Sequence, residues 1–138
     1  MTAPQQAVAP IAGARKVLIV MSDLLFRSKI DEVARRLGLE LRVAKSSEQL
    51  DRQLAAGEPA IAIVDLEESA LDPVAAIGRI RAAAPEMPIV GFAGHANVEV
   101  ITRGRGAGAT VLARSGFTVQ LPELLTQVAQ RERARVAG

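Results

Sequence analysis

Short runs of consecutive apolar residues alternate with amphipathic segments along most of this chain. Val17–Val20 and Ala60–Val64 contain no polar residue, which is typical of strands buried on both faces of a parallel sheet. Leu39–Val43 alternates apolar and polar positions, as an outer strand does. With two further runs, the pattern predicts strands over residues 16–20, 39–43, 60–65, 88–92 and 109–113.

Helical periodicity and capping residues fill the intervals between these strands. Asp23 can cap the first helix, Ser46 with Gln49 forms a capping-box pattern, and Asp72 precedes a proline at a first helical position. The predicted helices cover residues 24–37, 46–56, 73–84, 98–105 and 119–136, with a loop over 114–116. Strand and helix alternate five times, which predicts a doubly wound α/β fold, a three-layer sandwich around a five-stranded parallel sheet.

The first residues of the chain differ in composition from the rest. Residues 1–14 carry Pro4, Pro10 and Gly13 without periodicity, and we expect them to form a disordered leader. Residues 15–138 then form one domain. No apolar run approaches the ~20 residues that span a bilayer, and the start lacks the layout of a signal peptide, so we expect a cytoplasmic protein with no membrane partner.

The amino-acid composition argues against metal sites and nucleic-acid surfaces. The 138 residues include no cysteine and one histidine, which argues against zinc and other transition metals. The net charge is +2, and three phenylalanines are the only aromatic residues, which argues against a nucleic-acid surface with base stacking. A basic nucleic-acid accessory protein using Arg103, Arg105 and the terminal arginines stays as one alternative.

Five strand–helix units with an aspartate, Asp65, ending the third strand resemble the receiver domain of bacterial response regulators. The segments KVLIV, AIAIVD and PIV, and the pair Gly108-Ala109 before the fifth strand, carry this resemblance over about residues 15–136. The resemblance implies a CheY-like, flavodoxin-like topology with strand order 2-1-3-4-5. Its functional edge lies at the switch between strands one and three.

In receivers the aspartate at the Asp65 position accepts a phosphoryl group, with help from a divalent cation and several partner residues. An acidic pair after the first strand, a hydroxyl residue, a lysine and an aromatic residue make up this partner set. In register, this chain carries other residues at those positions, namely Met21 and Ser22, Ala93, Ser115 and Leu112. The resemblance is therefore to a degenerate pseudo-receiver, in which Asp65 is not expected to be used as a phospho-acceptor.

Other polar residues near the same edge have simpler interpretations. Asp23 is explained as a helix cap, His95 as a loop residue without a named partner, and Glu67 and Glu68 as a solvated acidic turn. Ser115 is expected within hydrogen-bonding reach of Asp65. Arg114 is cationic, but a shift of one residue along a strand is expected to turn its side chain to the opposite face.

The leading hypothesis is a stand-alone, phosphorylation-independent signalling protein that binds a protein partner or forms a homodimer. Its interaction face would lie on the fourth helix, fifth strand and fifth helix, with Val98, Arg103, Arg105 and Thr118. No enzyme activity and no cofactor are expected, because the turn after the first strand, Met21–Asp23, lacks a nucleotide or flavin loop. In the alternative hypothesis Asp65 accepts phosphate, and Asp23 or a loop glutamate holds Mg²⁺.

Overall fold

A computed structural model describes residues 8–138 of the chain. The elements follow one another as β1 (Val17–Val20), α1 (Leu24–Arg36), β2 (Leu41–Ala44), α2 (Ser47–Ala55), β3 (Ile61–Asp65), α3 (Pro73–Ala83), β4 (Ile89–Ala93), α4 (Val98–Gly106), β5 (Thr110–Ala113) and α5 (Arg114–Ala137). The five strands form one parallel sheet in the order β2-β1-β3-β4-β5. This order, and the alternation of strands and helices, confirm the predicted flavodoxin-like fold class.

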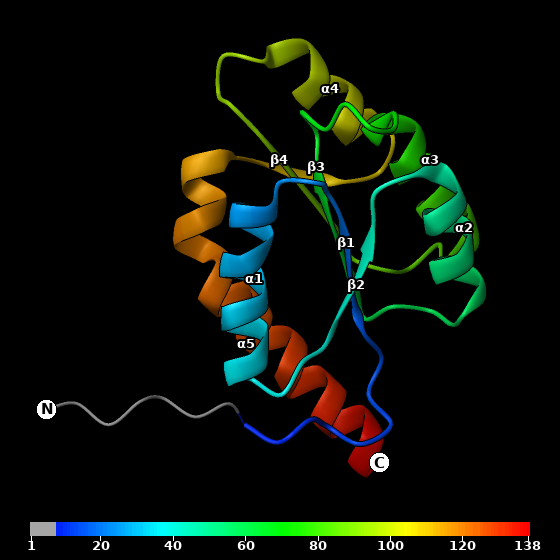
Figure 1. Ribbon diagram of the computed structural model, residues 1–138, viewed down its shortest axis with the longest axis vertical. Helices are drawn as coiled ribbons and strands as arrows, with labels where there is room; N and C mark the ends of the chain where they lie inside the picture. The colour runs from blue at the N-terminus through cyan, green and yellow to red at the C-terminus, as the bar shows by residue number, and fades with distance from the viewer. Residues whose placement is uncertain (1–7) are drawn as a thin grey trace, which may run out of the picture.

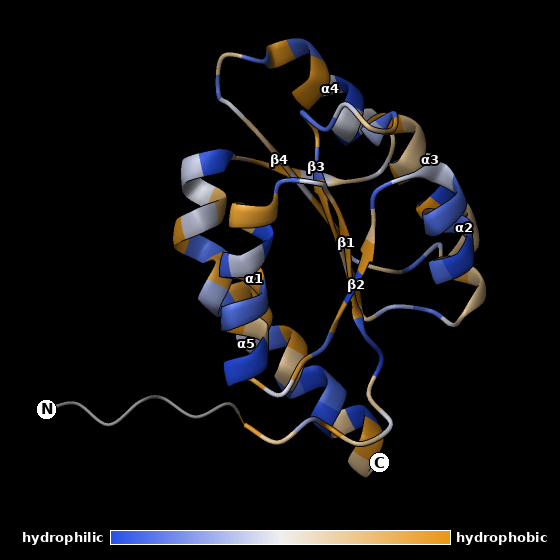
Figure 2. Ribbon diagram, in the orientation of Figure 1, coloured by the Kyte–Doolittle hydropathy of each residue, from blue (hydrophilic) through white to orange (hydrophobic). Residues whose placement is uncertain are grey.

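Helices cover both faces of the sheet. In Figure 1, α1 and α5 lie on one side, and α2, α3 and α4 lie on the other. Because successive strand side chains point to opposite faces, Ile19 and Ile63 pack toward α1 and α5, whereas Val20 and Val64 pack on the other side. Figure 2 shows the resulting concentration of apolar residues in the central strands. Each fully buried aliphatic side chain of β1 contributes about 1.5–3 kcal/mol to folding.

The predicted helix caps are present. Asp23 Oδ1 accepts a hydrogen bond from the Phe26 N–H at 3.0 Å, and Ser46 Oγ accepts one from the Gln49 N–H at 3.1 Å. Asp72 Oδ1 accepts bonds from two N–H groups at the start of α3. These bonds satisfy donors that a helix leaves free at its first turn, and so they set where each helix begins.

The start of the last helix differs from the prediction. Residues 114–116 were expected to form a loop, but α5 begins at Arg114, directly after β5. Phe117 is fully buried, with its ring stacked on that of Phe92 at 4.6 Å between centroids. Burial of this ring holds the first turn of α5 against the sheet.

Part of the predicted leader is described by the structure. The Ile11 N–H donates to the Gly38 carbonyl at 3.2 Å, and Arg135 Nη2 donates to the Gly13 carbonyl at 2.9 Å. Residues 8–14 therefore contact the end of α1 and the last helix. The prediction of disorder over residues 1–7 lies outside the described residues. Across residues 8–138, no helix is both long enough and apolar enough to cross a membrane.

Candidate functional site

Asp65 lies at the carboxyl edge of the sheet, where β3 ends. Its side chain is 8% exposed, and Oδ1 accepts a hydrogen bond from the Glu67 N–H at 2.9 Å. Burial raises the pKa of Asp65 above its ordinary value, although the Glu67 N–H and the charge of Arg114 act in the opposite direction. The carboxylate is thus partly removed from solvent and held by its own loop.

Arg114 is the cation at this edge. Its Nη2 lies 3.6 Å from Asp65 Oδ1 and 3.5 Å from Glu67 Oε1, so one guanidinium faces two carboxylates. The guanidinium also lies over two aromatic rings, 5.1 Å from the centroid of Phe26 and 5.0 Å from that of Phe92. These distances are those of cation–π contacts.

The expectation that Arg114 points away from Asp65 was wrong. The reasoning applied strand alternation to this residue, but β5 ends at Ala113 and Arg114 is the first residue of α5. Because Arg114 begins the helix, its side chain lies over the carboxyl edge of the sheet, beside Asp65. Ser115, expected near Asp65, is exposed instead, and within residues 8–138 no hydrogen bond joins the two.

Glu67 joins three parts of the site. Its Oε1 accepts a hydrogen bond from the Gly94 N–H at 3.0 Å, and Oε2 lies 3.5 Å from the Asn97 amide nitrogen. The hydrogen bond from Gly94 is the largest cause that places the pKa of Glu67 below its ordinary value. Glu67 therefore connects the β3–α3 loop to the β4–α4 loop and to Arg114, and it stays exposed, as expected for a solvated turn.

Glu68 is held on the other side of Asp65. Its carboxylate accepts hydrogen bonds from the Ser22 N–H at 2.5 Å and from the Ser22 hydroxyl at 2.8 Å. The N–H groups of Ser69 and Ala70 also donate to it. Burial alone would raise the pKa of Glu68, but these hydrogen bonds outweigh it and lower the pKa. Glu68 thus ties the end of β1 to the β3–α3 loop.

The remaining positions predicted from the resemblance provide no ligand group at this edge. Met21 and Ala93 are fully buried, and Leu112 is partly buried against the core on the α1 and α5 side. Asp23 caps α1, and His95 is exposed in the β4–α4 loop.

A shallow pocket of about 310 Å³ lies at this edge of the sheet, near the ends of β1, β3 and β5. It is lined by Ser22, Asp23, Asp65, Glu67, Glu68, Ser69 and Arg114.

The four carboxylates at this edge already hold hydrogen bonds from the protein. Asp65, Glu67, Glu68 and Asp23 each accept hydrogen bonds from backbone N–H groups of the protein. Within residues 8–138, no three side chains of the His, Cys, Asp and Glu types are grouped in a way that could hold a metal ion. The carboxylates therefore form a network of hydrogen bonds and ion pairs within the protein.

The predicted interaction face is only partly brought together. Val98 is 67% exposed on α4, and Arg103 is exposed five residues further along the helix. Arg105 donates from Nη2 to the Val111 carbonyl at 3.2 Å, which ties α4 to β5. Thr118 lies beside α1, where it lines a shallow pocket with Leu25, Phe26 and Lys29 among others. The three α4 residues share one helix, and Thr118 belongs to the α1–α5 surface.

Comparison with solved structures places this fold among receiver domains. The receiver domain of NtrX from Brucella abortus matches with a TM-score of 0.70 at 22% identity, over 83% of this chain and 98% of that one. A longer NtrX chain from the same organism matches with a TM-score of 0.70 at 19% identity, over 90% of this chain. A CheY-like receiver domain protein from Methanospirillum hungatei matches with a TM-score of 0.69 at 15% identity, over 86% of this chain and 99% of that one.

These identities establish a shared fold. This chain spans 29% of the longer NtrX chain, which corresponds in length to a single receiver domain of it. Comparisons with models of protein families and with curated proteins found no match.

Proposed function

We propose that this chain is a receiver-like signalling protein that works through protein–protein contacts and does not use phosphorylation of Asp65. The observation that carries the proposal is the ion pair of Arg114 with Asp65 and Glu67, at distances of 3.6 and 3.5 Å. This pair occupies the edge at which a phosphoryl group would have to approach Asp65.

Phosphoryl transfer to a carboxylate needs an accessible nucleophile and, in receivers, a divalent cation that offsets the charge of the phosphate. Asp65 is 8% exposed, and the two glutamates that flank it add negative charge to its surroundings. The neutral residues Met21 and Ser22 stand after β1, where receivers carry an acidic pair. Each feature disfavours phosphate entry, and together they support a fold used as a binding scaffold.

The surface around α4 supports a role in binding a protein partner or a second copy of the chain. Val98 on α4 and Val119 on α5 are 67% and 80% exposed, so apolar side chains are available near both sides of the β5 edge. The N-cap position of α4, Asn97, makes no capping hydrogen bond through its side chain to the helix. An uncapped helix start, such as the first turn of α4, is a segment that can adapt to a partner.

Arg133 and Arg135 of the last helix, by contrast, support the protein fold rather than a nucleic-acid site. Arg133 Nη2 donates to the Leu37 carbonyl at 3.1 Å, and Arg135 binds both the Gly13 carbonyl and Glu132. Cations that already hold protein acceptors contribute less to binding a phosphate backbone.

The proposal is tested by following amide NMR signals during addition of Mg²⁺ and then of beryllium fluoride, a phosphoryl mimic. We expect no saturable shifts at Asp65, Gly94 or Ala93 at millimolar Mg²⁺, alone or with the mimic. A receiver domain that retains its acidic pair serves as the positive control for the reagents. Saturable shifts that start at Asp65, spread into α4 and disappear in Asp65→Asn would instead support a phospho-accepting protein.

A further inference from the structure

The outer edge of β2 is open. β2 is the edge strand of the sheet, and the Val17 N–H of β1 donates to the Glu40 carbonyl at 2.9 Å. In a parallel ladder the backbone groups of alternate residues point to opposite sides, so those of Leu41 and Val43 point away from β1. Among residues 8–138, the outward N–H and C=O groups of these two residues have no hydrogen-bond partner. A short template for a further strand is therefore exposed.

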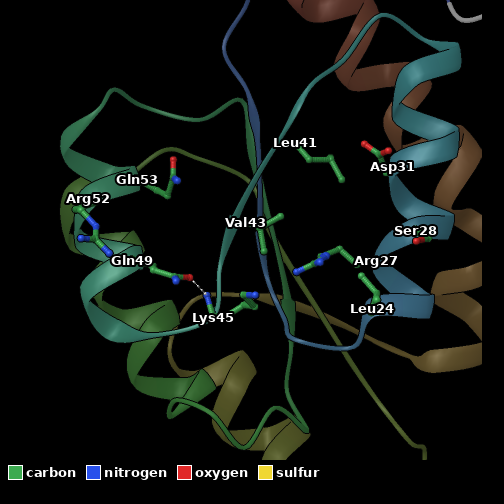
Figure 3. Close-up of a pocket in the computed structure, with 10 residues that line it drawn as sticks. All are labelled: Leu24, Arg27, Ser28, Asp31, Leu41, Val43, Lys45, Gln49, Arg52 and Gln53. Carbon is green, nitrogen blue, oxygen red and sulfur yellow. Dashed lines mark hydrogen bonds between the residues drawn. The ribbon is translucent and has the colours of Figure 1, made fainter.

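The next residue of this outward-facing series is already paired. The Lys45 N–H donates to the side-chain carbonyl of Gln49 at 2.7 Å, as the dashed line in Figure 3 shows. Gln49 therefore limits the open stretch to Leu41 and Val43. This bond also supports the orientation deduced for the other two residues, because Lys45 belongs to the same alternate set.

A groove runs along this edge between α1 and α2. Figure 3 looks onto β2, with α1 on one side and α2 on the other. The groove has a volume of about 600 Å³, and Leu24, Leu41 and Val43 supply its apolar surface. Leu24 is 63% exposed at the start of α1. An extended chain lying in the groove would meet apolar side chains and unpaired backbone groups together.

The groove is also positively charged. Arg27 of α1, Lys45 at the end of β2 and Arg52 of α2 line it, and none forms an ion pair within residues 8–138. Asp31 is the only acid lining the groove among the described residues, and it is paired with Arg35 at 2.9 Å. Three cations with one neutralised acid favour an anionic ligand.

We propose that this groove binds an acidic, extended peptide segment of a partner protein, which adds a strand to β2. Backbone hydrogen bonds to Leu41 and Val43 would supply affinity, and alternate side chains of the added strand would supply specificity. Apolar side chains on one face of the added strand meet Leu41 and Val43. Carboxylates on the other face meet Arg52 of α2. The site is at the edge of the sheet opposite β5 and does not depend on the proposed function.

A second copy of this chain is a poorer occupant for the same edge. Pairing β2 with β2 of another molecule would bring Arg27, Lys45 and Arg52 of both copies together. Like charges facing one another across an interface are unfavourable. A simple polyanion would satisfy the three cations but not the backbone groups of Leu41 and Val43. An acidic peptide satisfies both.

The test uses the full chain and a fluorescein-labelled peptide of alternating valine and glutamate, followed by fluorescence anisotropy at low salt. We expect saturable binding with a Kd below about 1 mM, accompanied by amide NMR shifts centred on Leu41 and Val43. The same peptide with its central backbone amides N-methylated keeps its charge but cannot add a strand. We expect it to bind at least about tenfold more weakly.

Charge-reversal variants locate the binding. Arg27→Glu and Arg52→Glu, on opposite walls of the groove, should each weaken the unmodified peptide about tenfold, equal to ~1.4 kcal/mol. Lys29→Glu makes the same charge change on a different face of α1 and should stay within about twofold of the parent chain. Far-UV circular dichroism establishes that each variant is folded, and Lys45→Glu replaces any that is not.

Three results would overturn the proposal. The first is an absence of saturable binding up to the stated limit. The second is equal affinity for the N-methylated peptide, which would indicate attraction by surface charge alone. The third is a dimer, measured by sedimentation, whose formation is blocked by the peptide, because the edge would then belong to a second copy of the chain.

Discussion

At the scale of single residues, the guanidinium of Arg114 connects the polar edge of the sheet to the aromatic part of the core. It faces Asp65 and Glu67 on one side and the rings of Phe26 and Phe92 on the other. Arginine suits this place because its planar cation stacks on rings while its N–H groups meet carboxylates. A lysine would present a more strongly hydrated point charge.

Arg114→Ala should lower the free energy of unfolding by about 1–2 kcal/mol at low salt. The substitution removes two cation–π contacts and a partly exposed ion pair. Solvent screening reduces the contribution of the ion pair. Chemical denaturation followed by far-UV circular dichroism measures it. Arg103→Ala, an exposed arginine of α4, is the control and should change stability by less than about 0.5 kcal/mol. Equal effects of the two substitutions would contradict the role given to Arg114.

Asp65→Asn should stabilise the protein near neutral pH and have a smaller effect in acid. Because burial raises the pKa of Asp65, the native state binds its proton more tightly than the unfolded state does. The aspartate therefore contributes stability below its unfolded pKa, about 3.9, and this contribution is lost as pH rises through the higher folded pKa. Asparagine removes the charge but keeps an oxygen for the Glu67 N–H. Urea unfolding from about pH 3 to pH 7 measures the trend. A stability gain that is larger in acid would contradict it.

The contribution of Glu132 to stability should depend on pH in the opposite direction to that of Asp65. Its side chain is 1% exposed, and it accepts hydrogen bonds from the Arg15 N–H at 2.8 Å and from Arg15 Nη2 at 2.9 Å. Burial would raise the pKa of Glu132, but the bonds from Arg15 and Arg135 outweigh it and lower the pKa. Its contribution is therefore present above the unfolded pKa, about 4.3, and is lost as pH falls through the folded pKa.

Glu132→Gln should consequently cost about 1–3 kcal/mol at pH 7 and less in acid. The same urea titrations measure this effect. Glu123→Gln, which changes an exposed carboxylate of the same helix, is the matched control and should have an effect within about 0.5 kcal/mol. A cost that does not depend on pH would mean that Glu132 acts through packing rather than through its charge.

At the scale of the elements, α4 is fixed to the sheet through a glycine. A Cβ at Gly104 would lie 3.0 Å from Leu66 Cδ1 and 3.2 Å from Val111 Cγ2, so the helix can approach the sheet only without a side chain there. Leu66 and Val111 are both buried and have little room to move. The helix therefore keeps a residue that is intrinsically unfavourable in a helix for the sake of packing.

Gly104→Ala should destabilise the protein by about 1 kcal/mol, because overpacking outweighs the gain in helix propensity. Gly78→Ala in α3 is the matched control. A Cβ there meets nothing within 4 Å, so the substitution should stabilise the protein by about 0.5–1 kcal/mol. Thermal unfolding of both variants gives the comparison. Equal stabilisation by the two substitutions would show that α4 is not held closely to the sheet.

The elements were predictable from the sequence wherever local signals were sufficient. Apolar runs located the strands, and side-chain caps at Asp23, Ser46 and Asp72 located three helix starts, since both depend on neighbouring residues. The start of α5 was missed because burial of Phe117, a contact with distant residues, decides it. The direction of Arg114 was missed for the same reason. The bonds of Glu67 and Glu68 join loops about 27 and 46 residues apart in the chain, which no local pattern contains.

At the scale of the whole molecule, the carboxyl edge of the sheet and the β2 edge are in contrasting states. At the carboxyl edge the carboxylates hold hydrogen bonds from the protein and Arg114 faces two of them. At the β2 edge the backbone groups and three cations are free among the described residues. The carboxylates at the edge where receivers perform chemistry thus hold partners within the protein, and the partner surface that we propose lies at the β2 edge.

We propose above all that Asp65 does not accept a phosphoryl group. Incubation of the chain with acetyl phosphate and Mg²⁺, followed by intact-mass spectrometry at short times, tests it most directly. A receiver domain that retains its acidic pair, treated in parallel, establishes that the donor is active. The account predicts no phosphoryl adduct on this chain. A phosphoryl adduct that forms on the parent chain and is absent from Asp65→Asn would contradict it.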